Sequence, residues 1–89
     1  MPSTAVDIDR RVTKLIADLA TVPLGEIRPA DRLREDLGLD SVSSMELLSL
    51  LAEELGLEIE LEEAIGVTTV AGTLEMARRH ALGAAASAG

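Results

Sequence analysis

The chain has 89 residues and a formal net charge of −8, with neither cysteine nor aromatic residues. This length allows one domain, and the lack of cysteine excludes disulfides and thiolate metal sites. A lone histidine, His80, cannot build a metal site by itself, so none is expected. Acidity and the lack of stacking rings argue against nucleic acid as a partner. Because no apolar stretch could span a bilayer or act as a signal peptide, a cytoplasmic location is expected. The chain is also expected to be a monomer.

The first predicted helix covers Ala5–Ala20, with Ser3 or Thr4 available as its cap. Apolar residues recur in it at spacings of three and four, which predicts one buried stripe. That stripe consists of Ile8, Val12, Leu15, Ile16 and Leu19. Pro23 and Gly25 follow and are expected to end the helix.

Residues 23–40 show no helical period, which makes a long connection for a compact domain. Four apolar residues are spaced along it: Ile27, Leu33, Leu37 and Leu39. We therefore expect a loop that is pinned to the core, with one turn of helix near 31–35.

The second predicted helix covers Ser41–Leu55 and stops at Gly56. Leu47 and Leu50 fall off its predicted inward stripe and are candidates for partial exposure. The inward stripe is predicted to consist of Val42, Met45, Leu48, Leu51, Ala52 and Leu55.

A short third helix is predicted over 60–65, ended by Gly66, and a fourth from a Thr68 or Thr69 cap to about Leu82. The buried face of the fourth helix is predicted to consist of Val70, Leu74, Ala77 and Ala81. Its last turns are expected to hold three basic residues that complement the helix dipole: Arg78, Arg79 and His80.

Together these elements predict an all-α fold, a small antiparallel four-helix bundle with three longer helices, a short third helix and a long first loop. The domain is expected to cover residues 1–83. Residues 84–89, which are small and have nothing to bury, are expected to form a flexible C-terminal tail.

Charge is distributed unevenly, because eleven acids and no basic residue lie between Glu35 and Ala77. Such a segment of one sign attracts basic partner surfaces and speeds their encounter. The alternative interpretation is a solvated helix face that keeps the chain in solution.

The most informative string is Asp36-Leu37-Gly38-Leu39-Asp40-Ser41-Val42, at the predicted start of the second helix. The first turn of a helix offers unpaired N–H groups and partial positive charge, which suit a phosphate ester on Ser41. Asp40 can cap the helix, and Gly38 permits a tight turn before it. The alternative is that these residues only cap the helix, with Ser43 and Glu46 forming a capping box.

The chain resembles the acyl carrier protein family over nearly its whole length. Besides the string around Ser41, the resemblance includes Met45-Glu46-Leu47-Leu48, Leu51-Ala52-Glu53-Glu54-Leu55, Glu58-Ile59, Glu62-Glu63-Ala64, Val67-Thr68-Thr69-Val70 and, in the first loop, Gly25-Glu26-Ile27 with Leu33. It implies that Ser41 carries a covalent 4′-phosphopantetheine arm. Asp40 would help a phosphopantetheinyl transferase to recognise the site, and Glu46, Glu53 and Val42 would face partner enzymes with basic docking surfaces, such as acyl-loading or ketosynthase-type enzymes.

The family's mechanism is transport: the arm holds acyl groups as thioesters and presents them to successive active sites, where tethering raises their local concentration. An enzyme is not expected, because Ser41 has no adjacent base. The chain departs from the family pattern at Val42, Ser43, Ser49 and Ala52. These departures and an Arg-rich, Ala-rich composition favour polyketide or other specialised biosynthesis over fatty acid synthesis. The alternatives are an aminoacyl or peptidyl carrier and an unmodified acidic helical interaction module.

Overall fold

The computed structural model describes the backbone of residues 5–88 and the side chains of residues 6–81. Four α-helices follow one another along the chain: α1 (Ala5–Ala20), α2 (Ser41–Leu55), α3 (Leu61–Ile65) and α4 (Val70–Ala88). A short 3₁₀ helix, η1 (Leu24–Glu26), follows α1. No strand occurs within residues 5–88; an isolated bridge pairs Arg32 with Thr69.

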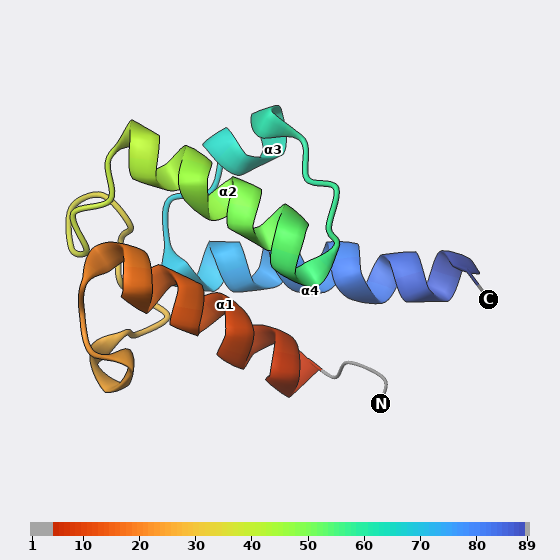
Figure 1. The fold of residues 1–89 in the computed structure, drawn as a ribbon, viewed down its shortest axis with the longest axis horizontal. Coiled ribbons are helices and arrows are strands. Elements are labelled where there is room, and N and C mark those ends of the chain that lie inside the picture. Colours follow the sequence, from red (N-terminus) through yellow and green to blue (C-terminus); the bar gives the residue numbers. More distant parts are fainter. Residues whose placement is uncertain (1–4, 89) are drawn as a thin grey trace.

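The helices form a small bundle in which α1 lies against both α4 and α2 (Figure 1). In Figure 1, α1 runs in the opposite direction to α2 and α4, and the short α3 lies at one edge beyond α2. The long connection between α1 and α2 folds back at one end of the bundle. The predicted all-helical bundle, with its short third helix and long first loop, is confirmed.

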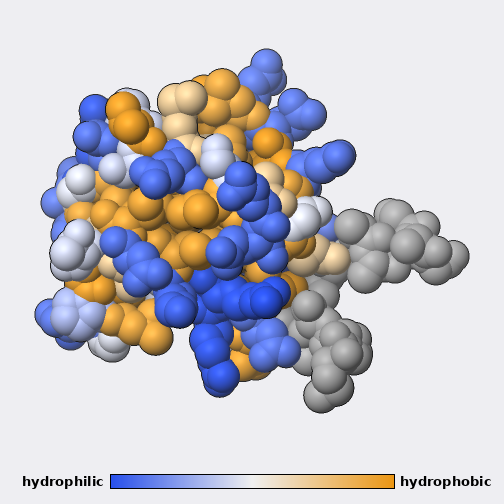
Figure 2. Space-filling model, viewed as in Figure 1, coloured by the Kyte–Doolittle hydropathy of each residue, from blue (hydrophilic) through white to orange (hydrophobic). Residues whose placement is uncertain are grey.

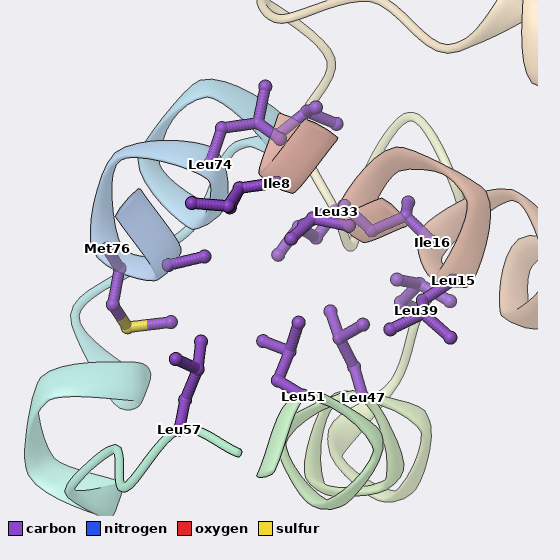
Figure 3. Packing of buried hydrophobic residues seen from close by; sticks show 13 residues of the cluster. Ile8, Leu15, Ile16, Leu33, Leu39, Leu47, Leu51, Leu57, Leu74 and Met76 are labelled. Atoms are coloured by element: carbon purple, nitrogen blue, oxygen red, sulfur yellow. The ribbon is translucent and has the colours of Figure 1, made fainter. Parts of the chain in front are cut away.

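The hydrophobic core cluster consists of aliphatic side chains and methionine, and Thr73 is the buried polar side chain among the described residues. Leu47 and Leu51 point from α2 toward Leu33 of the loop, and Leu57 and Met76 lie at one side of the cluster (Figure 3). The predicted stripe of α1 is confirmed, since its residues are buried apart from Leu19, which is partly buried against the core. Burying a side chain of this kind contributes about 1.5–3 kcal/mol each, so the interior of this domain depends on a small number of leucines, isoleucines and valines.

The end of α1 is formed by backbone geometry at Thr21. Thr21 has a φ of 57°, and the N–H of Val22 donates to the Ala17 carbonyl oxygen at 3.1 Å. This hydrogen bond is the one that closes a helix after a left-handed residue, a position that usually holds glycine. The helix thus ends before Pro23 and Gly25. The predicted caps Ser3 and Thr4 lie outside the described residues.

The loop between α1 and α2 is tied to the segment that joins α3 to α4. Leu33 N–H donates to the Thr68 carbonyl oxygen, Val70 N–H to that of Asp31 and Ala71 N–H to that of Pro29, each at 2.9 Å. Leu33 and Leu39 are buried, and Ile27 and Leu37 pack against the core. The expectation of a loop that is pinned to the core is therefore confirmed. The helical turn predicted near residues 31–35 begins one residue later and covers residues 32–37.

The predicted inward stripe of α2 is confirmed at Leu51, which is buried, but is wrong at several other positions because the helix is rotated. Leu47 is 4% exposed, whereas Met45 and Val42 are 59% and 72% exposed. Ala52 is also exposed, and Leu48, Leu50 and Leu55 are partly buried. Because apolar residues occupy so many positions of α2, the periodicity fits more than one face, and packing against the rest of the bundle selects among them.

Helix α4 begins as predicted, with the Thr69 hydroxyl accepting the Gly72 N–H at 3.0 Å. Val70, Leu74 and Ala77 are buried and Ala81 packs on the core, but the buried face is wider than predicted because it includes Thr73 and Met76. The Thr73 hydroxyl is satisfied, since it donates to the Thr69 carbonyl oxygen at 2.9 Å.

The backbone of α4 continues to Ala88, beyond the expected end near Leu82. Arg78, Arg79 and His80 are therefore not in its last turns. They instead pair with acids of other helices: Arg78 with Asp9 of α1, and Arg79 and His80 with Glu63 of α3. Alanine is the best helix former, which accounts for the longer helix. The flexible tail stays a prediction; side chains from residue 82 onward, and Gly89 entirely, lie outside the described residues.

Candidate attachment site

Ser41 is the first residue of α2 and is exposed. Asp40, directly before it, caps the helix: its Oδ1 accepts the Ser43 N–H at 2.8 Å, and its carbonyl oxygen accepts the Ser44 N–H at 2.9 Å. The predicted cap is confirmed, and Ser43 lies inside the helix rather than at its cap. Asp40 therefore fixes the backbone that presents the Ser41 hydroxyl to solvent.

The turn before the cap is held by glycine and by a buried leucine. Gly38 has a φ of +71°, a left-handed conformation that costs other residues about 1–2 kcal/mol. Leu39 is 2% exposed, and its N–H donates to the Leu33 carbonyl oxygen at 2.8 Å. Asp36 accepts the backbone N–H of Arg32 at 2.7 Å. The motif thus anchors one residue in the core and leaves Ser41, two positions later, outside.

The pKa of Asp40 is lowered from 3.8, first by the hydrogen bond from the Ser43 backbone N–H. The Ser43 side chain, the Val42 N–H and the positive charge of Arg34 lower this pKa further. The pKa of Asp36 is likewise lowered, first by the hydrogen bond from the Arg32 backbone N–H. Each carboxylate therefore binds its proton less readily in the folded chain than in the unfolded chain.

A carboxylate with a lowered pKa stabilises the fold fully above its unfolded pKa, and this contribution is lost as the pH falls through the folded pKa. We therefore expect the urea midpoint to drop between pH 6 and pH 3, and Asp40→Asn to reduce that drop, since asparagine caps a helix without titrating. Asp18→Asn, which changes an exposed aspartate of α1, serves as the control. An equal drop for Asp40→Asn and the parent chain would show that the cap does not contribute.

An apolar cleft of about 550 Å³ opens beside Ser41. Loop residues 33–35 and the first turns of α2 line it on one side, with α3, Val67, Thr68 and α4 opposite. Its inner wall includes the buried Leu47, Leu51, Thr73 and Met76. Met45, Leu61 and Ile65 line it from its exposed rim. The sequence allows the hypothesis that an aliphatic core opens between helices to shelter an acyl chain, but it does not predict where the cleft lies, because ordinary core packing explains the same residues.

The three side chains predicted to meet partners lie on the outer surface of α2. Val42, Glu46 and Glu53 are all exposed, and their spacings of four and seven residues place them on one helix face. Figure 2 shows apolar side chains reaching the surface among hydrophilic ones over α2 and α3. Partner binding by these residues remains a prediction.

No histidine is among the described residues that line the cleft beside Ser41. His80, the sole histidine of the chain, contacts Glu63 and does not line the cleft. Across the described residues there is no group of three or more histidine, aspartate or glutamate side chains placed to hold a metal ion, and no helix is long and apolar enough to cross a membrane. Ser41 is therefore an exposed serine on a capped helix beside an apolar cleft, and its role as the attachment point stays a prediction.

These features define a class: a small helical carrier domain with a serine at the start of its second helix. Residues 10–77 match the family described as "Phosphopantetheine attachment site". The chain is also 34% identical, over 70 residues, to an acyl carrier protein of Saccharopolyspora erythraea, an alignment that covers 79% of this chain and 74% of that protein.

The chain belongs to the acyl carrier protein family. It is a non-catalytic carrier, its cofactor is phosphopantetheine, and a phosphopantetheinyl transferase attaches that group. The structure fits such a group, because the Ser41 hydroxyl is unobstructed and the adjoining cleft leaves room beside it.

Proposed function

We propose that Ser41 carries the phosphopantetheine arm and that the chain delivers acyl groups, held on that arm as thioesters, to the enzymes of a biosynthetic pathway. The observation that carries this proposal is the exposed Ser41 at the Asp40-capped start of α2, beside an apolar cleft. The arm supplies the thiol that forms the thioester. The residues of this chain supply the attachment point, the docking surface and the shelter.

In the attachment step, the Ser41 hydroxyl oxygen forms a bond to the phosphorus that bears the pantetheine of coenzyme A. The pyrophosphate bond breaks, the nucleotide leaves with the electron pair, and the hydroxyl proton passes to a base of the transferase. Asp40 contributes by holding Ser41 at the helix start and by presenting a charged carboxylate to the transferase.

The cleft can shelter a carried acyl chain. Its walls are mostly aliphatic, and Ser41 is among its lining residues, so a chain tethered there can fold back between α2 and α3. Burying the chain would gain about 0.8 kcal/mol for each methylene removed from water. A sheltered chain would be withdrawn from solvent until the carrier meets the next enzyme.

The pathway we favour is polyketide or another specialised biosynthesis in the cytoplasm, served by a monomeric carrier. Val42, Ser49 and Ala52 depart from the usual pattern and are exposed, so they alter the surface that partners meet. An aminoacyl or peptidyl carrier differs in the group it loads. An unmodified interaction module would dock through the same acidic helix and carry no arm.

The attachment is tested by incubating the chain with coenzyme A and a broad-specificity phosphopantetheinyl transferase, then measuring intact mass. One phosphopantetheinyl group is expected. Cleavage after Glu35 and Glu46 releases a peptide with three serines, Ser41, Ser43 and Ser44, and fragmentation of that peptide is expected to place the group on Ser41. No mass gain, with a transferase that modifies another carrier, would favour the unmodified interaction module.

The charge of α2 gives a second test. The double variant Glu46→Lys and Glu53→Lys changes the net charge from −8 to −4, since each replacement adds two positive charges. We expect the second-order rate constant for modification to fall about tenfold at low salt, because charge complementarity mainly governs encounter. The difference should shrink as salt screens the charges.

The control reaches the same net charge with Asp18→Lys and Glu75→Lys, which change exposed acids of α1 and α4. A local docking surface predicts a small effect of this control. Equal losses in the two double variants would mean that net charge, rather than the face of α2, governs the encounter.

A further inference from the structure

Helix α3 forms one wall of the cleft but has little of its own to hold it in place. It spans Leu61–Ile65, contains no buried residue and has no side-chain cap at Glu60. Leu61 and Ile65 are 51% and 70% exposed, although both line the cleft. Isolated helices this short are unstable in water, so the position of α3 depends on its contacts with the rest of the bundle.

Glu63 provides a polar contact between α3 and α4. Its Oε1 lies 2.5 Å from His80 Nε2, and its Oε2 accepts a hydrogen bond from Arg79 Nη2 at 3.2 Å. The Glu63 and His80 side chains are 30% and 27% exposed, whereas Arg79 is 61% exposed. The two oxygens of the Glu63 carboxylate therefore contact two successive residues of α4. Of these, His80 is largely shielded from solvent and Arg79 is exposed.

A second ion pair of the fold offers a comparison. Arg78 Nε lies 3.1 Å from Asp9 Oδ1, which links α4 to α1. It is a contact by distance rather than an aligned hydrogen bond, because Arg78 Nε donates to the Leu74 carbonyl oxygen at 3.4 Å. This pair joins two long helices that already share the core, whereas the Glu63 pair joins a five-residue helix that packs only the partly buried Ala64 against it.

We propose that Glu63 is a positioning residue that holds α3 against α4 as the movable wall of the cleft, so that retention of a carried acyl chain depends on its contacts with Arg79 and His80. The proposal rests on the proposed function, because it concerns the chain tethered at Ser41. Breaking the contact frees α3 to move away from α4 without disturbing the α1 core. The fraction of time in which the cleft is open then rises, and with it the exposure of the thioester and its chain to water.

The test uses the arm-bearing chain loaded with an acetyl or an octanoyl group, in the parent and in two variants. Glu63→Ala removes the contact of α3, and Asp9→Ala, a matched loss of a carboxylate paired to an α4 arginine, leaves α3 untouched. Thioester hydrolysis in mildly alkaline buffer is followed by intact mass, and urea unfolding of each variant records global stability.

We expect octanoyl hydrolysis to be slower than acetyl hydrolysis in the parent. Glu63→Ala should speed octanoyl hydrolysis about fivefold, which is the change in rate expected from the loss of a contact worth about one hydrogen bond. The same variant should change acetyl hydrolysis by less than about twofold. Asp9→Ala should leave the octanoyl-to-acetyl ratio unchanged even where it lowers the urea midpoint. A purely structural role of Glu63 would move the midpoint and not the ratio.

An unchanged octanoyl-to-acetyl ratio in Glu63→Ala, with a sheltered octanoyl chain in the parent, would overturn the role of Glu63 alone. Equal hydrolysis of the two thioesters in the parent would overturn the shelter and, with it, the positioning role. Failure to load either group would count against the attachment at Ser41 itself. Each result thus separates the inference from the function on which it rests.

Discussion

Replacing Ser41 by alanine is expected to abolish transfer of the phosphopantetheinyl group completely. The hydroxyl oxygen is the atom that bonds to phosphorus, and alanine has no atom to replace it. Because Ser41 is exposed and its backbone is fixed by Asp40, the loss of one hydroxyl should leave the fold intact. Intact mass after incubation with coenzyme A and a transferase measures the effect directly, and circular dichroism verifies that the helices remain.

The matched control is Ser44→Ala, which changes another exposed serine in the first turn of α2. Its modification should reach the level of the parent chain. If Ser41→Ala still gained the group, attachment would have to involve another hydroxyl, and the role assigned to the start of α2 would be wrong. Loss of modification in both variants would point instead to disturbance of the docking surface.

The second large effect is expected from Leu47→Ala, which should destabilise the fold by about 2–5 kcal/mol. Leu47 is 4% exposed and packs in the central cluster (Figure 3). The stability of a domain of this size is roughly 4–13 kcal/mol in total, so the loss removes a large share of it. Urea unfolding followed by circular dichroism measures the change in the free energy of unfolding.

Met45→Ala is the informative comparison, because periodicity alone placed Met45 on the inward stripe and Leu47 off it. Met45 is 59% exposed, and a surface replacement usually changes stability by no more than about 0.5 kcal/mol. A larger loss for Met45→Ala than for Leu47→Ala would mean that α2 is rotated relative to the structure described above.

The parts of the fold that the sequence predicts well are those encoded by local chemistry. Helix α1 has a clean apolar stripe, Asp40 and Thr69 have side chains suited to capping, and Gly38 has the conformational freedom that its turn requires. Each signal involves residues within a few positions of one another. The candidate site benefits from this, because the Ser41 motif is itself local.

The parts that the sequence does not predict depend on contacts between distant segments. The rotation of α2 is decided by packing, since leucines at positions 47, 48, 50 and 51 satisfy several helical faces. The pairing of Glu63 with Arg79 and His80 spans helices whose relative position no local pattern gives. The position of the cleft could not be predicted for the same reason, because the cleft forms where α2, α3 and α4 meet.

The hydrogen bonds that tie the loop before Ser41 to residues 68–71 also set an order of assembly during synthesis. The ribosome makes the chain from its N-terminus, so Ser41 leaves before the segment that secures its loop. Contacts between segments so far apart in sequence form late, because closing the intervening chain costs entropy first. In a nascent chain that ends before α4, the loop before Ser41 would therefore not be held in place. A transferase would meet Ser41 in the position described here only on a chain that has folded through α4.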